Sequence, residues 1–122
     1  MLACKRVYDP PEDQDGLRVL VDRLWPRGLS REAARVDEWL KALAPSAELR
    51  RSFGHDPSQW ESFKARYFEE LHRPAQLEEA RRLQQRASIQ RVTLLFGARN
   101  RALNNAVALK EFLETAGADI SE

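Results

Sequence analysis

Residues 17–24 read Leu-Arg-Val-Leu-Val-Asp-Arg-Leu, and the apolar centre of this stretch, residues 19–21, decides the fold class. Consecutive apolar residues in the middle of a strand are expected when both faces of the sheet are covered. The stretch ends at Trp25-Pro26-Arg27-Gly28, because Pro26 has no N–H to donate to a central strand ladder. We therefore expect a buried strand over residues 17–24.

Two further runs have strand character. Residues 91–96 read Arg-Val-Thr-Leu-Leu-Phe, and residues 4–8 read Cys-Lys-Arg-Val-Tyr before the break at Asp9-Pro10-Pro11. The second and third strands are more than sixty residues apart, and a connection of that length favours parallel pairing. The sequence therefore predicts an α/β fold, with a small, mostly parallel sheet of about three strands covered by helices.

Helical patterns fill most of the remaining chain, so a helix-rich protein is expected. Ser30 is a good N-cap for a helix that runs to about Leu43. Asp56, with Pro57 at the first helical position, begins the clearest helix, and Pro74 ends it. The other predicted helices cover residues 46–53, 77–87 and 101–116, the last with Gly117 as its C-terminal stop.

Length and composition indicate one folded domain over residues 1–122. The apolar fraction of 43% and charged fraction of 32% are typical of a well-solvated globular protein, and no stretch approaches the roughly 20 apolar residues of a membrane span. Cys4 is the single cysteine, so no intrachain disulfide can form, and Lys5 and Arg6 interrupt any signal-peptide core. We expect an unanchored, cytoplasmic protein.

The basic residues are almost all arginines. The chain has sixteen Arg, four Lys and a net charge of +1, which argues against binding driven by global charge. The planar guanidinium group binds phosphate or carboxylate with two parallel hydrogen bonds. Codon usage in a GC-rich genome explains the same excess, so composition alone does not establish a ligand.

Polar side chains follow two predicted strands at their carboxyl ends, where open parallel sheets bind ligands. Those at the end of the strand over residues 17–24 are Asp22, Arg23, Trp25 and Arg27, and those after the last strand are Asn104 and Asn105. If these strands are neighbours, the side chains face one crevice, and free N–H groups at the start of the next helix favour an anion there. The sequence therefore predicts a pocket for an unknown small ligand that bears phosphate or carboxylate.

Asp22 and His55 are the candidates for a general base. His55 is followed by Asp56, and imidazole suits proton transfer near neutral pH. Two histidines and one cysteine, far apart in the chain, give no metal-ligand spacing. No P-loop, Gly-rich dinucleotide turn or Gly-x-Ser-x-Gly motif occurs, so we expect no metal and no cofactor. Whether the chain is an enzyme stays open.

Each candidate also has a purely structural interpretation. Asp22 and Arg23 point to opposite faces of a strand and can pair with helix charges. Trp25 can pack at the edge of the core, and Arg27 can belong to a tight turn. Asn104 and Asn105 can cap the following helix, which is a frequent role of Asn near a helix start.

Two other classes of function are alternatives. A surface rich in Trp and Arg is typical of binding hot spots, which favours a protein-interaction module without catalysis. Weak nucleic-acid binding ranks third, because the arginines available for it are interspersed with Glu78 and Glu79. These arginines are Arg81, Arg82, Arg86 and Arg91. A homodimer is compatible with the sequence, although no heptad pattern predicts one.

Several blocks, in order along nearly the whole chain, resemble the YeaO-like branch of the family called domain of unknown function 488. The blocks are residues 5–11 (KRVYDPP), 19–30 (VLVDRLWPRGLS), 39–41 (WLK), 44–46 (APS), 53–57 (FGHDP) and 104–107 (NNAV). The resemblance implies a stand-alone cytoplasmic α/β domain. It supplies no catalytic residues that can be carried over to this chain.

Two comparisons with relatives, one within this branch and one with a more distant branch, limit the chemistry that the resemblance implies. Relatives usually have an acidic segment ending in His before the paired asparagines, whereas this chain has residues 99–103, RNRAL. A more distant branch carries Cys-His-Arg where this chain has Asn104, Asn105 and Ala106. The resemblance therefore disfavours a redox or thiol-nucleophile mechanism here.

Overall fold

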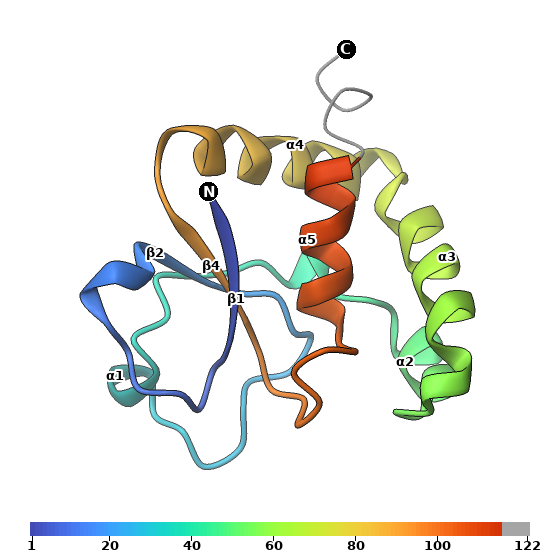
Figure 1. Ribbon diagram of the computed structural model, residues 1–122, viewed down its shortest axis with the longest axis horizontal. Helices are drawn as coiled ribbons and strands as arrows, with labels where there is room; N and C mark the ends of the chain where they lie inside the picture. Colours follow the sequence, from blue (N-terminus) through green and yellow to red (C-terminus); the bar gives the residue numbers. More distant parts are fainter. Residues whose placement is uncertain (116–122) are drawn as a thin grey trace.

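The computed structural model describes residues 1–115 and contains a four-stranded sheet (Figure 1). Its strands are β1 (Leu2–Arg6), β2 (Leu17–Leu20), β3 (Glu38–Trp39) and β4 (Val92–Phe96). The strand order is β1-β4-β2-β3, and all three pairings are parallel. The predicted α/β class and parallel sheet are confirmed, with one strand more than expected.

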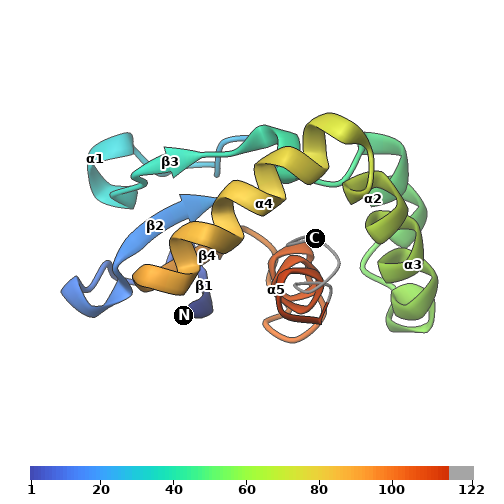
Figure 2. The same cartoon turned by 90° about the horizontal axis from the view of Figure 1, so that it is seen from above.

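The helices divide unequally between the two sides of the sheet. The longer helices are α2 (Ala47–Phe53), α3 (Trp60–Leu71), α4 (Pro74–Ile89) and α5 (Asn105–Thr115). In both views α5 lies between the strands and α3 (Figures 1 and 2). The single-turn α1 (Arg31–Ala34) packs on the other face, and short 3-10 helices cover Asp13–Asp15, Lys41–Leu43 and Pro57–Gln59.

Side chains along the central strands alternate between two hydrophobic clusters, as the pleat of a strand requires. Val19 and Val21 pack with the longer helices, in the same cluster as Leu94. Leu20 and Leu95 belong to a smaller cluster with α1 and the half-buried Trp25 and Trp39. Residues 19–21 are all 0% exposed. The expectation that β2 is covered on both faces is therefore confirmed.

The predicted helix over residues 30–43 is wrong. The Ser30 hydroxyl caps α1 as expected, accepting from the Ala33 N–H at 3.0 Å. The helix stops after one turn, where Arg35 has a left-handed φ of 48°. The Arg18 guanidinium donates to the carbonyls of Ala34 and Arg35 at 2.8 and 3.0 Å, so these oxygens are taken before a second turn can use them. The chain continues instead as β3, beside β2.

Other predicted boundaries shift by a few residues. The helix expected at 77–87 begins at Pro74, which has no N–H to lose at a first helical position. The last helix begins at Asn105 rather than 101, because the Asn100 carboxamide oxygen accepts from the N–H groups of Ala102 and Leu103 in a turn. Its predicted end at Ala116 and Gly117 lies outside the described residues. None of the helices within residues 1–115 is long and apolar enough to cross a membrane.

A buried ion pair attaches the segment before β2 to that strand. Asp15 and Arg18 have side chains 6% and 4% exposed, and their Oδ2 and Nη1 atoms lie 2.6 Å apart. Lys5 of β1 also donates to Asp15, at 3.0 Å. Burial opposes ionisation of Asp15, but the Glu12 N–H and the two cations outweigh it, so the pKa of Asp15 lies below its ordinary value.

Asp15→Asn is expected to lower the free energy of unfolding by about 3 kcal/mol, because Arg18 keeps a buried charge without its partner. A depressed carboxyl pKa contributes stability above the ordinary value of about 4, and that contribution is lost as pH falls through the folded pKa. Urea unfolding of variant and wild type at neutral and acidic pH measures both effects.

The matched control is Glu12→Gln, since Glu12 also binds Lys5 but its side chain is 50% exposed. This change is expected to cost less than about 1 kcal/mol. Equal costs for the two variants, or a gap that widens towards acidic pH, would contradict the role given to Asp15.

Candidate functional site

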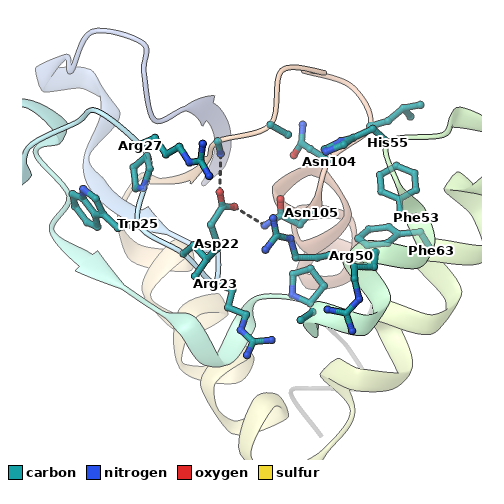
Figure 3. Close-up of a pocket in the computed structure, with 18 residues that line it drawn as sticks. Asp22, Arg23, Trp25, Arg27, Arg50, Phe53, His55, Phe63, Asn104 and Asn105 are labelled. Atoms are coloured by element: carbon teal, nitrogen blue, oxygen red, sulfur yellow. Dashed lines mark hydrogen bonds between the residues drawn. The ribbon is translucent and has the colours of Figure 1, made fainter.

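A cavity of about 590 Å³ opens at the carboxyl ends of β2 and β4 (Figure 3). Its walls come from residues 22–27, from Pro45 and α2, from His55, from α3, and from residues 97–98 and 103–105. All seven residues that the sequence singled out line it: Asp22, Arg23, Trp25, Arg27, His55, Asn104 and Asn105. The structure thus places all seven residues around one cavity, although their roles differ.

Asp22 joins three segments at this cavity. Its Oδ2 accepts a hydrogen bond from the Gly97 N–H at 2.8 Å, and its Oδ1 accepts one from the Asn105 side-chain amide at 3.0 Å. The same amide donates to the Val21 carbonyl at 3.0 Å. The end of β2, the end of β4 and the start of α5 are therefore held by one carboxylate.

The surroundings of Asp22 change its acidity. Burial raises the pKa of Asp22, and the hydrogen bonds from Asn105 and Gly97 and the charge of Arg50 offset only part of that rise. We call the part of the cavity formed by Asp22 its floor. Tyr67 is fully buried on α3 near this floor, and burial raises the pKa of Tyr67. The nearby Asp22 carboxylate raises that pKa further. The floor of the cavity is therefore a poorly solvated environment for charge.

Four arginines line the cavity that contains this single carboxylate. Arg23 and Arg27 belong to the segment after β2, and Arg50 and Arg51 belong to α2. All four are exposed, and within residues 1–115 none of their guanidinium groups has a hydrogen bond or ion pair. Figure 3 shows the Arg27 and Arg50 groups directed towards Asp22, and the Arg23 group directed away. The cavity is strongly positive although the chain is nearly neutral.

Arg50 and Arg51 were missed by the sequence prediction. The helix over residues 46–53 was expected. Arg50 precedes Phe53 by about one helical turn, so the side chains of Arg50 and Phe53 can lie on the same face of that helix. Nothing in the sequence indicated that this surface faces the ends of β2 and β4. Stacking of Phe53 on Phe63, with ring centroids 4.6 Å apart, sets the place of α2 against α3.

Trp25 and Asn104 have structural roles. The Trp25 indole N–H donates to the Leu29 carbonyl at 2.6 Å, and its ring packs edge-on against Trp39 at 5.5 Å. Asn104 is 2% exposed; its oxygen accepts from the Val107 N–H and its amide donates to the Asn100 carbonyl, both at 2.9 Å. These are the packing and capping roles that the sequence offered as alternatives, and both place the residues at the wall.

Asn105 keeps one free group. Its amide nitrogen is used by Val21 and Asp22, whereas its Oδ1 accepts no hydrogen bond from the described residues. Within residues 1–115, every fully buried side-chain oxygen or nitrogen has a hydrogen-bond partner. Because the Asn105 oxygen has no such partner, it is accessible to solvent. Asn105 therefore offers the cavity a hydrogen-bond acceptor beside Asp22.

The two candidates for a general base are separated. His55 is exposed, has a left-handed φ of 59°, and lies across Asn104 from Asp22 in Figure 3. Asp56 does not pair with His55; its Oδ1 accepts from the N–H and hydroxyl of Ser58, at 3.0 and 2.8 Å. The predicted N-cap role of Asp56 is confirmed, and no acid–imidazole pair forms.

Other reactive groups lie elsewhere. Burial raises the pKa of the Cys4 thiol to about 11, which disfavours the nucleophilic thiolate at neutral pH. Within residues 1–115, His, Cys, Asp and Glu form no group of three that can hold a metal ion. The chemical resources of the cavity are accordingly its arginines, the Asn105 oxygen and its apolar surface.

Fold and cavity together define a small parallel α/β domain with a positively charged pocket at the strand carboxyl ends. A family model described as the inactive DUF488-N3 subclade matches residues 1–121, and the chain belongs to this branch of the domain-of-unknown-function 488 family. The resemblance seen in the sequence blocks is confirmed.

Bacterial relatives cover almost the entire chain. The chain is 43% identical to the uncharacterized protein YeaO of Escherichia coli over 93% of this chain and 97% of that protein. It is also 43% identical to the uncharacterized protein Rv3073c of Mycobacterium tuberculosis, over 88% of this chain and 89% of that one. No solved structure matches the chain.

Asp22→Asn tests the junction at the cavity floor. One of the two N–H donors then faces an NH₂ group, so the free energy of unfolding is expected to fall by about 1–3 kcal/mol. A raised carboxyl pKa contributes stability below the ordinary value of about 4, and this is lost as pH rises through the folded pKa. Denaturant titrations should therefore show the advantage of wild type shrinking from acidic to neutral pH.

Asp13→Asn is the control, because Asp13 is exposed and its carboxylate has no partner among the described residues. Its effect should stay within about 0.5 kcal/mol at every pH. An advantage of wild type over Asp22→Asn that grows with pH would be the wrong sign for this account.

Proposed function

We propose that the cavity binds a small anionic ligand bearing phosphate or carboxylate, and that binding without catalysis is the function of the chain. One observation carries the proposal: four exposed arginines without partners among residues 1–115 line a cavity that contains a single carboxylate. Guanidinium groups form short, charge-assisted hydrogen bonds with both kinds of anion. The position at the strand carboxyl ends is the usual ligand site of such sheets.

Three observations favour binding over a reaction. Asp22 accepts two hydrogen bonds within the fold, and His55 lies across the cavity from it without an acidic partner. Burial suppresses ionisation of the single thiol, at Cys4. The matching family model is itself described as inactive.

The two alternative functions receive less support. A protein-interaction module needs an exposed apolar surface, but the side chains of Trp25 and Trp60 are both half-buried and Trp25 borders a concave site. For nucleic acid, the side chain of Arg82 pairs with Glu78 and Glu79 on the same helix. Arg86 pairs with Glu38, which leaves less positive charge on this helix for a phosphate backbone.

Arg27→Ala and Arg50→Ala are expected to weaken anion binding by at least about tenfold each, since a hydrogen bond to a charged group contributes about 1.5–3 kcal/mol. Isothermal titration with inorganic phosphate, citrate and adenosine monophosphate measures the affinities. Thermal melts with the same probes report binding to the folded state.

Arg99→Ala is the matched control, because Arg99 is exposed on the segment after β4 but does not line the cavity. Its affinities should equal those of wild type. The proposal fails if none of the three probes binds, or if Arg99→Ala weakens binding as much as the other two variants.

A further inference from the structure

We infer that the ligand of this cavity is an organic anion with an apolar or aromatic body, rather than a bare inorganic ion. The anionic group faces Arg27 and Arg50, and the body lies on an apolar wall. We define the apolar wall as Pro45, Ala47, Phe53, Phe63 and Leu103. The inference rests on the proposed function and specifies the class of ligand for the same cavity.

The apolar wall lies apart from Arg27 in the cavity. Arg27 lies on one side of Asn105, and the rings of Phe53 and Phe63 lie on the other (Figure 3). Arg50 reaches between them from α2. Half of the residues that line the cavity are apolar, whereas a site for a hydrated ion is expected to consist mainly of donors. A ligand in contact with both sides must combine charge with apolar surface.

The size of the cavity supports the same conclusion. Its volume is about 590 Å³. A water molecule occupies about 30 Å³ of the liquid, so acetate or phosphate, equivalent to a few waters, would leave most of the space to solvent. Pockets for organic ligands measure about 300–1,000 Å³ and are largely apolar, with a few polar groups that orient the ligand.

The floor of the cavity restricts how much charge the ligand carries. The Asp22 carboxylate lies close enough to Arg50 for that charge to lower its pKa, so it already takes part of the positive potential. A second anionic group placed over Asp22 would meet repulsion. The accessible Asn105 oxygen beside it instead accepts an N–H or O–H donor. The geometry therefore points to one anionic group, an adjacent donor and an apolar body.

Two matched pairs of probes test the inference by isothermal titration: acetate against 2-naphthoate, and inorganic phosphate against adenosine monophosphate. In at least one pair, the member with the aromatic body is expected to bind at least tenfold more tightly, because it removes apolar surface from water. The pair that binds shows whether the anionic group is a carboxylate or a phosphate. Equal affinities within each pair would overturn the inference.

Variants locate the body of the ligand. Leu103→Ser is expected to lower the preference for the aromatic member at least threefold without changing the affinity of acetate or phosphate. Phe53→Leu keeps the core apolar, since Phe53 is 8% exposed, and is expected to lower the preference in the same direction. Ile89→Ser is the control, because Ile89 is 82% exposed at the end of α4 and lies outside the cavity.

The outcomes separate this inference from the proposed function. If acetate and phosphate bind as well as their aromatic partners and Arg27→Ala weakens them, the anion site stands and the organic ligand is excluded. If neither these four probes nor citrate binds, both are excluded. A preference that Leu103→Ser and Phe53→Leu leave unchanged would place the body elsewhere and overturn the assignment of the apolar wall.

Discussion

The carboxylate of Asp22 is the constraint on which the cavity depends. It accepts hydrogen bonds from the Gly97 N–H after β4 and from the Asn105 side-chain amide at the start of α5. The same amide also donates to the carbonyl of Val21, the residue before Asp22. The Trp39 indole secures the Asp22 carbonyl at 2.7 Å from the other side of the sheet. A side chain at position 97 would begin 3.1 Å from Asp22 Oδ2, so glycine allows this close approach. Residues from β3, from the end of β4 and from the start of α5 thus converge on one residue after β2.

The same residue determines the electrostatics of the site. Burial of a carboxylate is unfavourable unless hydrogen bonds and opposite charge compensate it. Here two N–H donors and Arg50 provide that compensation, and the pKa of Asp22 still remains raised. Arg50 is therefore shared between the stability of the floor and the potential of the cavity, to which Arg23, Arg27 and Arg51 also contribute. An anion that binds near Arg50 also changes the surroundings of the carboxylate on which the fold depends.

The sequence predicted the parts of this arrangement that local rules control. Apolar residues 19–21 and 92–96 identify buried parallel strands, and the carboxyl ends of such strands meet at one edge, so Asp22 and Asn105 were placed together correctly. Long-range contacts control the rest. Arg18 donates hydrogen bonds to the Ala34 and Arg35 carbonyls, so the predicted helix ends early and the chain continues as β3. The packing of Phe53 on Phe63 places Arg50 at the cavity. Neither contact can be recognised from the residues that lie next to it in the sequence.

The polar residues around the cavity fall into two groups, those that have partners within the chain and those that do not. Asp22 and Asn104 have their hydrogen bonds satisfied by the chain itself, so the fold explains their presence. Arg23, Arg27 and Arg51 do not: clustered like charges repel, and within residues 1–115 none of these three gains an ion pair in return. Neutral residues at these positions would serve stability at least as well. Side chains that oppose local stability without a structural partner are characteristic of functional sites, which directs attention to the arginines rather than to the acid, the imidazole or the amides.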